Sequence, residues 1–146
     1  MKKVKYLLAL IILIILWFIY PYLIDYKINL REVSYATISN AQLDIQEIGK
    51  TVFNVAEKDL PYIIKCCESI SIYRRASDRE IPMGFPTQLT LYTENECYII
   101  SFYTIENEVS YILISYESSN GKRWLARGKM NSDILIQFYS FLNLYC

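Results

Sequence analysis

Residues 87–129 read TQLTLYTENECYIISFYTIENEVSYILISYESSNGKRWLARGK, and this stretch decides the expected fold. Apolar and aromatic side chains recur in it as four runs, which predict strands over residues 87–92, 97–103, 109–116 and 123–129. The runs are separated by short polar segments, one of which carries the turn signal Ser119-Asn120-Gly121. Connections this short join antiparallel neighbours, so the stretch predicts a four-stranded β-meander.

The segments before the meander add strands and a helix. Residues 32–38 and 50–55 predict a first pair of strands, and residues 40–49 between them show no clear pattern. Apolar residues then follow at helical spacing. They predict a helix that has Pro61 in its first turn and runs to about Ile72.

A long loop and a closing helix complete the expected domain. Residues 74–86 contain two prolines and a glycine and predict the longest loop. After the meander, Asn131 or Ser132 is expected to cap a last helix, whose apolar stripe runs from Ile134 to Leu142. The predicted class is α+β, with an N-terminal helix, a strand pair, a helix, a four-stranded antiparallel meander and a C-terminal helix.

The N-terminal residues 6–24 form an apolar run without a charge, preceded by Lys2, Lys3 and Lys5. As a helix the run would be roughly 28 Å long, which matches the hydrocarbon core of a bilayer. It predicts a retained transmembrane anchor, with a cleaved signal or a buried helix as alternatives, since no small-x-small site follows closely. By the positive-inside rule, the lysines predict a cytoplasmic N-terminus.

The anchor sets the expected domain organisation and location. Residues 1–5 are a cytoplasmic flank, 6–24 the single-pass anchor, 25–31 a tether, and 32–146 the extracytoplasmic α+β domain. The protein is thus expected in the inner or plasma membrane, with its domain periplasmic or extracellular. The expected partners are the lipid bilayer, through residues 6–24, and a protein outside the cytoplasm.

The charge balance and the lack of histidine argue against several classes of function. The chain has 15 basic and 15 acidic residues, and without the three N-terminal lysines 12 basic residues stand against 15 acidic ones. A slightly acidic domain argues against nucleic acid as a partner. The lack of histidine removes the commonest general base and most catalytic zinc sites. No catalytic residue, metal, cofactor or small-molecule substrate is expected, and the protein is predicted not to be an enzyme.

Charged residues gather in places that are candidate binding surfaces. Two pairs of carboxylates fall at predicted turns, where they are either solvated or face a basic partner: Glu94 with Glu96, and Glu106 with Glu108. Three arginines fall on the predicted long loop, a usual place for recognition: Arg74, Arg75 and Arg79. Three cations share one face of the last strand, where they either protect an edge strand or contact an acidic partner: Arg123, Arg127 and Lys129. Trp124 alternates with them and is either a core residue or a binding hot spot.

The four cysteines are Cys66, Cys67, Cys97 and Cys146, an even set in the oxidising compartment that the anchor predicts. Their spacing matches neither a C-x-x-C redox motif nor a structural zinc pattern. If they are oxidised, the expected bridges are Cys67–Cys97, from helix to sheet, and Cys66–Cys146. Reduced buried thiols are the main alternative, and a redox function is the third.

The order of elements resembles that of small, N-terminally anchored or secreted bacterial α+β domains, most of them uncharacterised. The resemblance covers most of residues 33–144 and rests on element order and hydrophobic pattern. Some bacterial immunity proteins that neutralise toxins outside the cytoplasm are similar. The resemblance implies a membrane-anchored, non-catalytic protein-binding domain, most concretely an immunity or inhibitor protein that blocks a toxin or enzyme. The alternative is a structural accessory subunit of an envelope complex, recruited through its transmembrane helix.

Overall fold

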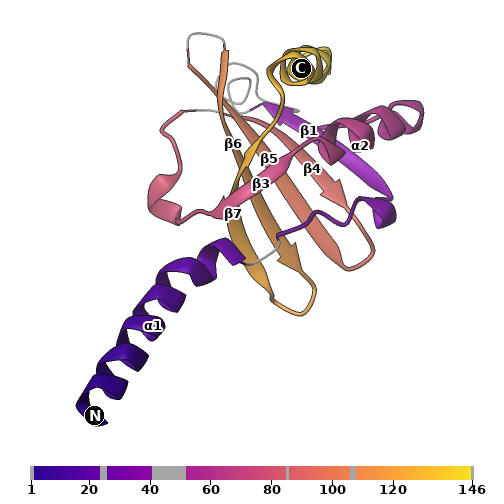
Figure 1. The fold of residues 1–146 in the computed structure, drawn as a ribbon. Coiled ribbons are helices and arrows are strands. Elements are labelled where there is room, and N and C mark those ends of the chain that lie inside the picture. Colours follow the sequence, from indigo (N-terminus) through magenta and orange to yellow (C-terminus); the bar gives the residue numbers. More distant parts are fainter. Residues whose placement is uncertain (1, 24–25, 41–51, 85, 106–107, 146) are drawn as a thin grey trace.

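The structure of the chain, a computed structural model, describes residues 2–23, 26–40, 52–84, 86–105 and 108–145 (Figure 1). Within these ranges the α-helices are α1 (Lys2–Leu23), α2 (Leu60–Glu68) and α3 (Ser132–Leu142). Single-turn 3-10 helices are η1 (Leu30–Glu32), η3 (Glu57–Asp59) and η4 (Asp78–Glu80). The strands are β1 (Tyr35–Asn40), β2 (Val52–Asn54), β3 (Ser71–Arg75), β4 (Thr87–Tyr92), β5 (Glu96–Ile105), β6 (Glu108–Ser118) and β7 (Arg123–Lys129).

These strands form one antiparallel sheet in the order β2-β1-β4-β5-β6-β7-β3, which confirms the α+β class. The predicted meander is its centre, because β4 to β7 are neighbours in chain order. β4 and β7 have the predicted bounds, whereas β5 and β6 extend beyond them. The predicted turn after β6 is also confirmed: the Gly121 N–H donates to the Ser118 carbonyl at 2.9 Å. Gly121 has a φ of +80°, which glycine adopts without a steric cost.

β3 lies where the sequence predicted the end of a helix and the start of a loop. α2 ends at Glu68 because Ser69 turns the chain: its N–H and its hydroxyl both donate to the Cys66 carbonyl, at 3.1 and 2.6 Å. Ile70 and Ile72 follow and pack against the core. β-Branched side chains pack well on a sheet, and β7 supplies hydrogen-bond partners for the backbone. The prediction that the helix runs to Ile72 is therefore wrong, because α2 ends at Glu68. The predicted loop over residues 74–86 is wrong at its start, because Arg74 and Arg75 belong to β3.

The position of β3 also corrects the prediction that the last strand is a sheet edge. β3 pairs with β7, with Arg75 opposite Ala126 and Arg74 opposite Arg127. β7 is thus an internal strand, and β2 and β3 are the edges of the described sheet. Charged side chains on an edge strand oppose pairing with other chains. In this protein that role falls to the arginines of β3.

One face of the sheet is covered by α2 and α3. The main core lies between this face and the two helices. Phe102 on β5 meets Phe138 on α3 edge to face, with ring centroids 5.8 Å apart. On β1 the core takes Ala36 and Ile38. The largest fully buried side chains of the domain are Ile38, Ile63, Cys67, Leu89, Leu91, Tyr98, Ile100, Phe102, Ile114, Phe138 and Leu142.

The N-terminal end of the domain lies further upstream than predicted. The described part of the predicted tether packs on the core through Ile28 and Leu30, and Val33 joins them. The Asn29 N–H donates to the Tyr98 hydroxyl at 3.1 Å, which ties this segment to β5. Residues 26–33 are therefore part of the folded domain.

α1 projects away from the sheet (Figure 1), and its end approaches β3. Its described apolar side chains are largely exposed; Trp17, for example, is 81% exposed. In the part of the chain that the structure describes, no helix combines the length and the apolarity that a membrane crossing requires. This finding contradicts the predicted single-pass anchor over residues 6–24. It equally contradicts the predicted location, with a cytoplasmic N-terminus and a domain outside the membrane.

The predicted start of the last helix is confirmed. Asn131 is the N-cap of α3, and its side-chain oxygen accepts a hydrogen bond from the Asp133 N–H at 2.9 Å. This bond satisfies one of the backbone donors that a helix leaves unpaired at its first turn. Pro61 lies in the first turn of α2, as predicted, where its missing N–H costs no helical hydrogen bond.

Candidate functional site

Glu96 is the centre of a polar network at one end of the sheet. It is the first residue of β5, and its N–H donates to the Thr93 hydroxyl of the preceding turn at 2.9 Å. One carboxylate oxygen accepts a hydrogen bond from the Tyr98 hydroxyl at 2.6 Å, and the other accepts one from the Tyr116 hydroxyl at 2.8 Å. Glu96 and Tyr98 are two apart on a strand, so they share a face. Both oxygens of this carboxylate are thus occupied by protein donors.

Four aromatic rings surround this network. Tyr116 lies opposite Tyr98 on one side and opposite Trp124 on the other, because β6 runs between β5 and β7. The Tyr116 and Trp124 rings are stacked, with centroids 5.1 Å apart and planes at 14°. Tyr26 approaches Trp124 from the segment that follows α1, at 5.0 Å between centroids. Residues far apart in the sequence therefore build one aromatic wall.

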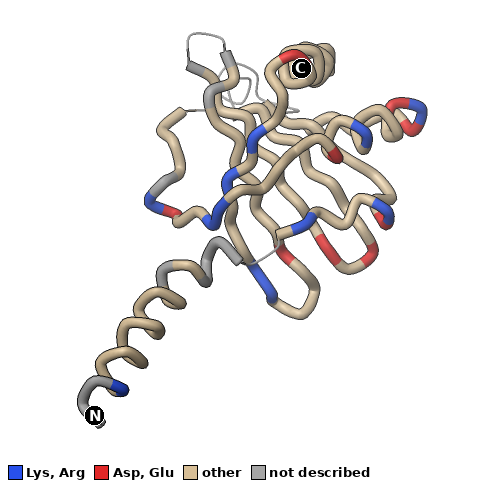
Figure 2. The backbone as a smooth tube through the Cα atoms, in the orientation of Figure 1, with Lys and Arg blue, Asp and Glu red and all other residues tan. Residues whose placement is uncertain are grey.

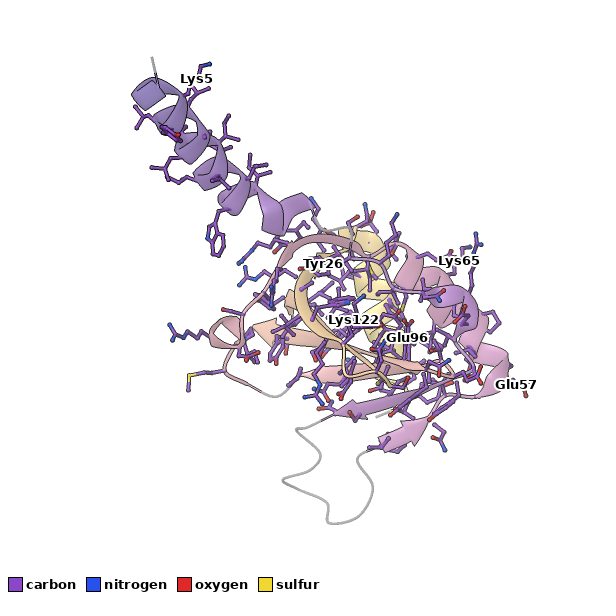
Figure 3. All side chains as sticks on the ribbon, turned by 90° about the horizontal axis from the view of Figure 1, so that it is seen from below. Lys5, Tyr26, Glu57, Lys65, Glu96 and Lys122 are labelled. Atoms are coloured by element: carbon purple, nitrogen blue, oxygen red, sulfur yellow. The ribbon has the colours of Figure 1, made fainter. Side chains whose placement is uncertain are left out.

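Two open cavities meet at Trp124. The first, the Glu96 pocket, has a volume of about 460 Å³ and is lined by Tyr26, Lys27, Asn29, Arg75, Glu96, Tyr98, Tyr116, Lys122, Arg123 and Trp124. The second, the Ser115 pocket, has a volume of about 710 Å³ and is lined by Arg75, Ala76, Ser77, Asp78, Ser115, Arg123, Trp124 and Leu125. We call the two pockets together the Trp124 site. Figure 3 shows Tyr26, Glu96 and Lys122 in the middle of the domain, whereas Glu57 lies at its periphery.

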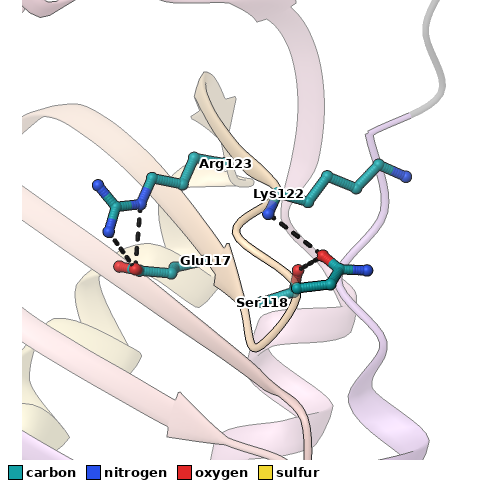
Figure 4. A network of polar contacts seen from close by, with 5 residues as sticks. Glu117, Ser118, Lys122 and Arg123 are labelled. Carbon is teal, nitrogen blue, oxygen red and sulfur yellow. Dashed lines mark hydrogen bonds and ion pairs between the residues drawn. The ribbon is translucent and has the colours of Figure 1, made fainter.

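The charge of the Trp124 site is mainly positive. Four cationic side chains line the Glu96 pocket against one carboxylate, and two cationic side chains line the Ser115 pocket, also against one carboxylate. Arg75 and Arg123 belong to both pockets. Arg123 forms an ion pair with Glu117 (Figure 4), but both side chains are more than half exposed, so the pair is screened by water. Basic residues gather along β3 and β7 in Figure 2.

The tyrosines of the network act as hydrogen-bond donors. Burial is the main cause that raises the pKa of Tyr98, and the hydrogen bond to Glu96 raises it further. The same two causes, in the same order, raise the pKa of Tyr116. Both hydroxyls therefore keep their protons at neutral pH and hold Glu96 in place. With their pKa raised, neither hydroxyl is an activated nucleophile.

The structure describes no cluster of cysteine and acidic side chains that could hold a metal ion. The Glu96 carboxylate is also the single acidic group that lines its pocket among the described residues. A divalent cation in a protein takes several oxygen ligands, usually including more than one carboxylate. The Glu96 pocket therefore does not have the donor set of a metal centre.

The arginines predicted on the loop are separated by the structure. Arg75 points into the Trp124 site, where it lines both pockets. Arg74 is its neighbour on β3 and lies opposite Arg127, on the other face of the sheet. Arg79 is exposed on η4 and lines neither pocket. Of these three predicted residues, the structure places Arg75 alone in the site.

The cations predicted on the last strand are separated in a similar way. Arg123 lines the Trp124 site. The Arg127 guanidinium lies 4.1 Å above the ring centroid of Tyr111, a cation–π contact, and it also donates to the Tyr111 hydroxyl. Lys129 is exposed opposite Ser71. The three cations share one face of β7, as predicted, but of the three only Arg123 lines the described pockets of the Trp124 site.

The predicted carboxylate pairs also do not act as pairs. Glu94 is exposed in the turn between β4 and β5, whereas Glu96 turns inward to the two tyrosines. Glu106 lies outside the described residues, and so does the side chain of Glu108, the first residue of β6.

The predicted Cys67–Cys97 bridge is absent, and Cys66, Cys67 and Cys97 are free thiols. Cys67 is buried on the core face of α2. Cys97 precedes Tyr98, whose side chain is in the core, so strand alternation directs Cys97 to the other face of the sheet. The sheet therefore separates the two thiols. Cys146, the predicted partner of Cys66, lies outside the described residues.

Sequence reasoning missed much of the site, including Tyr26, Lys27, Tyr98, Tyr116 and Lys122. The abundance of tyrosine in the chain hides the ones that matter. A usable signal was present, because the short turns fix which strand positions lie opposite each other. Applied to the predicted meander, this rule aligns Tyr98, Tyr116 and Trp124 on one face.

The chain was also compared with protein-family models, with curated proteins and with solved structures, and none of them matches it. The comparisons therefore leave the resemblance to anchored bacterial domains untested. The class of protein has to be argued from the fold and the Trp124 site.

Proposed function

We propose that this α+β domain is a non-catalytic protein-binding module that holds an acidic segment of a partner protein at the Trp124 site. The observation that carries the proposal is the combination of a mainly cationic lining with aromatic walls at Trp124. Trp, Tyr and Arg are the residues most enriched at binding hot spots. The most concrete version is an inhibitor or immunity protein that covers part of a toxin or enzyme.

The sign of the charge selects an acidic ligand over a cationic one. Aromatic walls with a carboxylate are also typical of sites for quaternary ammonium groups. Here, however, the carboxylate of Glu96 already accepts two hydrogen bonds, and Lys27, Arg75, Lys122 and Arg123 line the same pocket. A cationic ligand would meet net repulsion, because cations outnumber carboxylates in the lining. An acidic side chain would gain several ion contacts with exposed cations.

A direct test is selection from a displayed library of random peptides against the full chain. A mild non-ionic detergent keeps the exposed side chains of α1 from associating. We expect enrichment of peptides rich in Asp and Glu that also carry an aromatic residue. Their binding should weaken as the salt concentration rises, because exposed charges are screened.

A charge variant with a matched control locates the binding. Arg75→Gln with Lys122→Gln should lower the affinity of a selected peptide roughly tenfold or more, since two cations of the site are lost. Lys58→Gln with Lys65→Gln removes the same charge from exposed positions on η3 and α2, and should leave the affinity unchanged. Selection of peptides without acidic residues, or an equal effect of the two double variants, would overturn the proposal.

A further inference from the structure

We propose that the acidic segment binds as an added β-strand beside Arg123, on the side of β7 that β3 leaves uncovered. This inference rests on the function proposed above and adds how the segment is held. Strand addition is a common mode of peptide recognition, in which main-chain hydrogen bonds give affinity and alternate side chains give specificity.

The pairing of β3 with β7 ends before Arg123. The β3–β7 ladder ends with Arg75 opposite Ala126, followed by one more hydrogen bond, from the Ala76 N–H to the Leu125 carbonyl at 2.8 Å. The chain then leaves the sheet and forms η4. In an antiparallel ladder, alternate residues direct their N–H and C=O groups to the same neighbour. Arg123 therefore directs these groups to the same side as Leu125, beyond the end of β3.

The two pockets lie where the side chains of an added strand would go. Ser115 and Leu125 line one pocket, whereas Tyr98 and Tyr116 line the other. Successive residues on these strands point to opposite faces, so the pockets open on opposite faces of the sheet. Trp124 lines both. The side chains of an added strand alternate in the same way and would enter the two pockets in turn.

The charges at this edge favour an acidic strand over a second copy of this chain. Arg75 is the last residue of β3, and Arg123 is the residue of β7 that β3 leaves unpaired. Both arginines line both pockets. A second copy that pairs through its edge strand β3 would bring Arg74 and Arg75 of its own. Like charges placed directly opposite each other on neighbouring strands are destabilising. A segment with Asp or Glu at alternate positions has the complementary charge.

The first experiment scans the backbone of an acidic peptide selected on the full chain. Single N-methyl groups are placed at each of its amides in turn. Strand addition predicts a loss of affinity of roughly tenfold at the one amide that donates to the Arg123 carbonyl, and little loss at the amides on either side of it. In parallel, the amide hydrogen of Arg123 should exchange roughly tenfold more slowly once the peptide is bound.

A pair of variants tests the same backbone group from the side of the protein. Arg123→Gln removes the guanidinium alone, whereas Arg123→Pro also removes the N–H. Proline is tolerated in a strand where its N–H would face away from the ladder. Affinity should therefore be weaker in the proline variant than in the glutamine variant. If the proline variant does not fold, the N-methyl scan on the unaltered chain tests strand addition by itself.

The possible results separate the two proposals. If acidic peptides bind but no single N-methyl position lowers the affinity and the Arg123 amide keeps its exchange rate, strand addition is overturned and the acidic binding site stands. If no acidic peptide is selected, the proposed function fails, and this inference fails with it. Self-association of the chain without peptide, lost in the Arg123→Pro variant, would show that a second copy occupies the edge and would also overturn the inference.

Discussion

At the scale of single residues, Glu94 and Glu96 show how much two positions in a turn can differ. Glu94 is exposed, whereas Glu96 accepts hydrogen bonds from two tyrosine hydroxyls and faces the aromatic wall. The difference arises because β5 begins at Glu96. From that residue on, strand alternation decides which face of the sheet each side chain takes.

The Tyr98 hydroxyl should make the stability of the domain depend on pH in the alkaline range. Burial, together with the hydrogen bond to Glu96, raises its pKa above the ordinary value of 10.0. Above about pH 10 the unfolded chain loses this proton while the folded domain keeps it, so the unfolded state gains stability as the pH rises. The stabilisation is therefore complete below the unfolded pKa and is lost as the pH rises toward the folded one.

The variant Tyr98→Phe isolates this effect. At pH 7 it should lower the free energy of unfolding by about 1–3 kcal/mol, because Glu96 loses a buried donor. Above pH 10 its stability should decline less steeply than that of the unaltered protein. Urea unfolding between pH 7 and pH 11 measures both. Tyr73→Phe, at an exposed position on β3, serves as the control and should match the unaltered protein at pH 7. An unchanged alkaline slope in Tyr98→Phe would contradict the assignment.

At the scale of elements, the connection from α2 to β3 passes so close to β7 that it limits the size of one side chain on β7. Gly128 on β7 lies beneath this connection. A Cβ at this position would come within 2.9 Å of the Ile70 side chain and within 2.8 Å of the Ile114 side chain. The residue is therefore glycine because of a close approach between elements, and its backbone conformation does not require it.

Gly128→Ala should destabilise the domain by about 1–3 kcal/mol, since the added methyl group overpacks a filled core. Urea unfolding at neutral pH measures the loss. Lys129→Ala, at the adjacent exposed position, is the control, and it should stay within about 0.5 kcal/mol of the unaltered protein. Equal stability of the two variants would show that the core has room beneath Ile70.

At the scale of the whole molecule, the described core takes no side chain from α1. The side chains that pack it come from residues 28 onward, and the described side chains of α1 are largely exposed. We therefore expect residues 26–146 alone to unfold in one cooperative transition, with a free energy in the usual range of about 5–15 kcal/mol. Chemical denaturation monitored by tryptophan fluorescence would measure it, because Trp124 lies in this fragment. A gradual, non-cooperative transition would mean that α1 is required for the fold.

Local signals predicted much of the fold. The four central strands, the turn at Gly121 and the Asn131 cap were predicted because alternation, turn chemistry and capping act within a few residues. β3 was missed because Ile70 and Ile72 also fit the helical spacing that precedes them, and its pairing with β7 joins residues far apart in the chain. The helical form of the N-terminal run was predicted, but the membrane crossing inferred from its hydropathy is contradicted.

The sequence by itself determined the α+β class, the central meander and the closing helix, since each depends on neighbours in the chain. The tertiary structure decided that β7 is internal, that the sheet separates Cys67 from Cys97, and that Glu96 is held by tyrosines on β5 and β6. It also decided the Trp124 site, which gathers Tyr26, Arg75 and Trp124. These features depend on strand order and register, which are set by hydrogen bonds between distant segments and by the packing of helices over one face of the sheet.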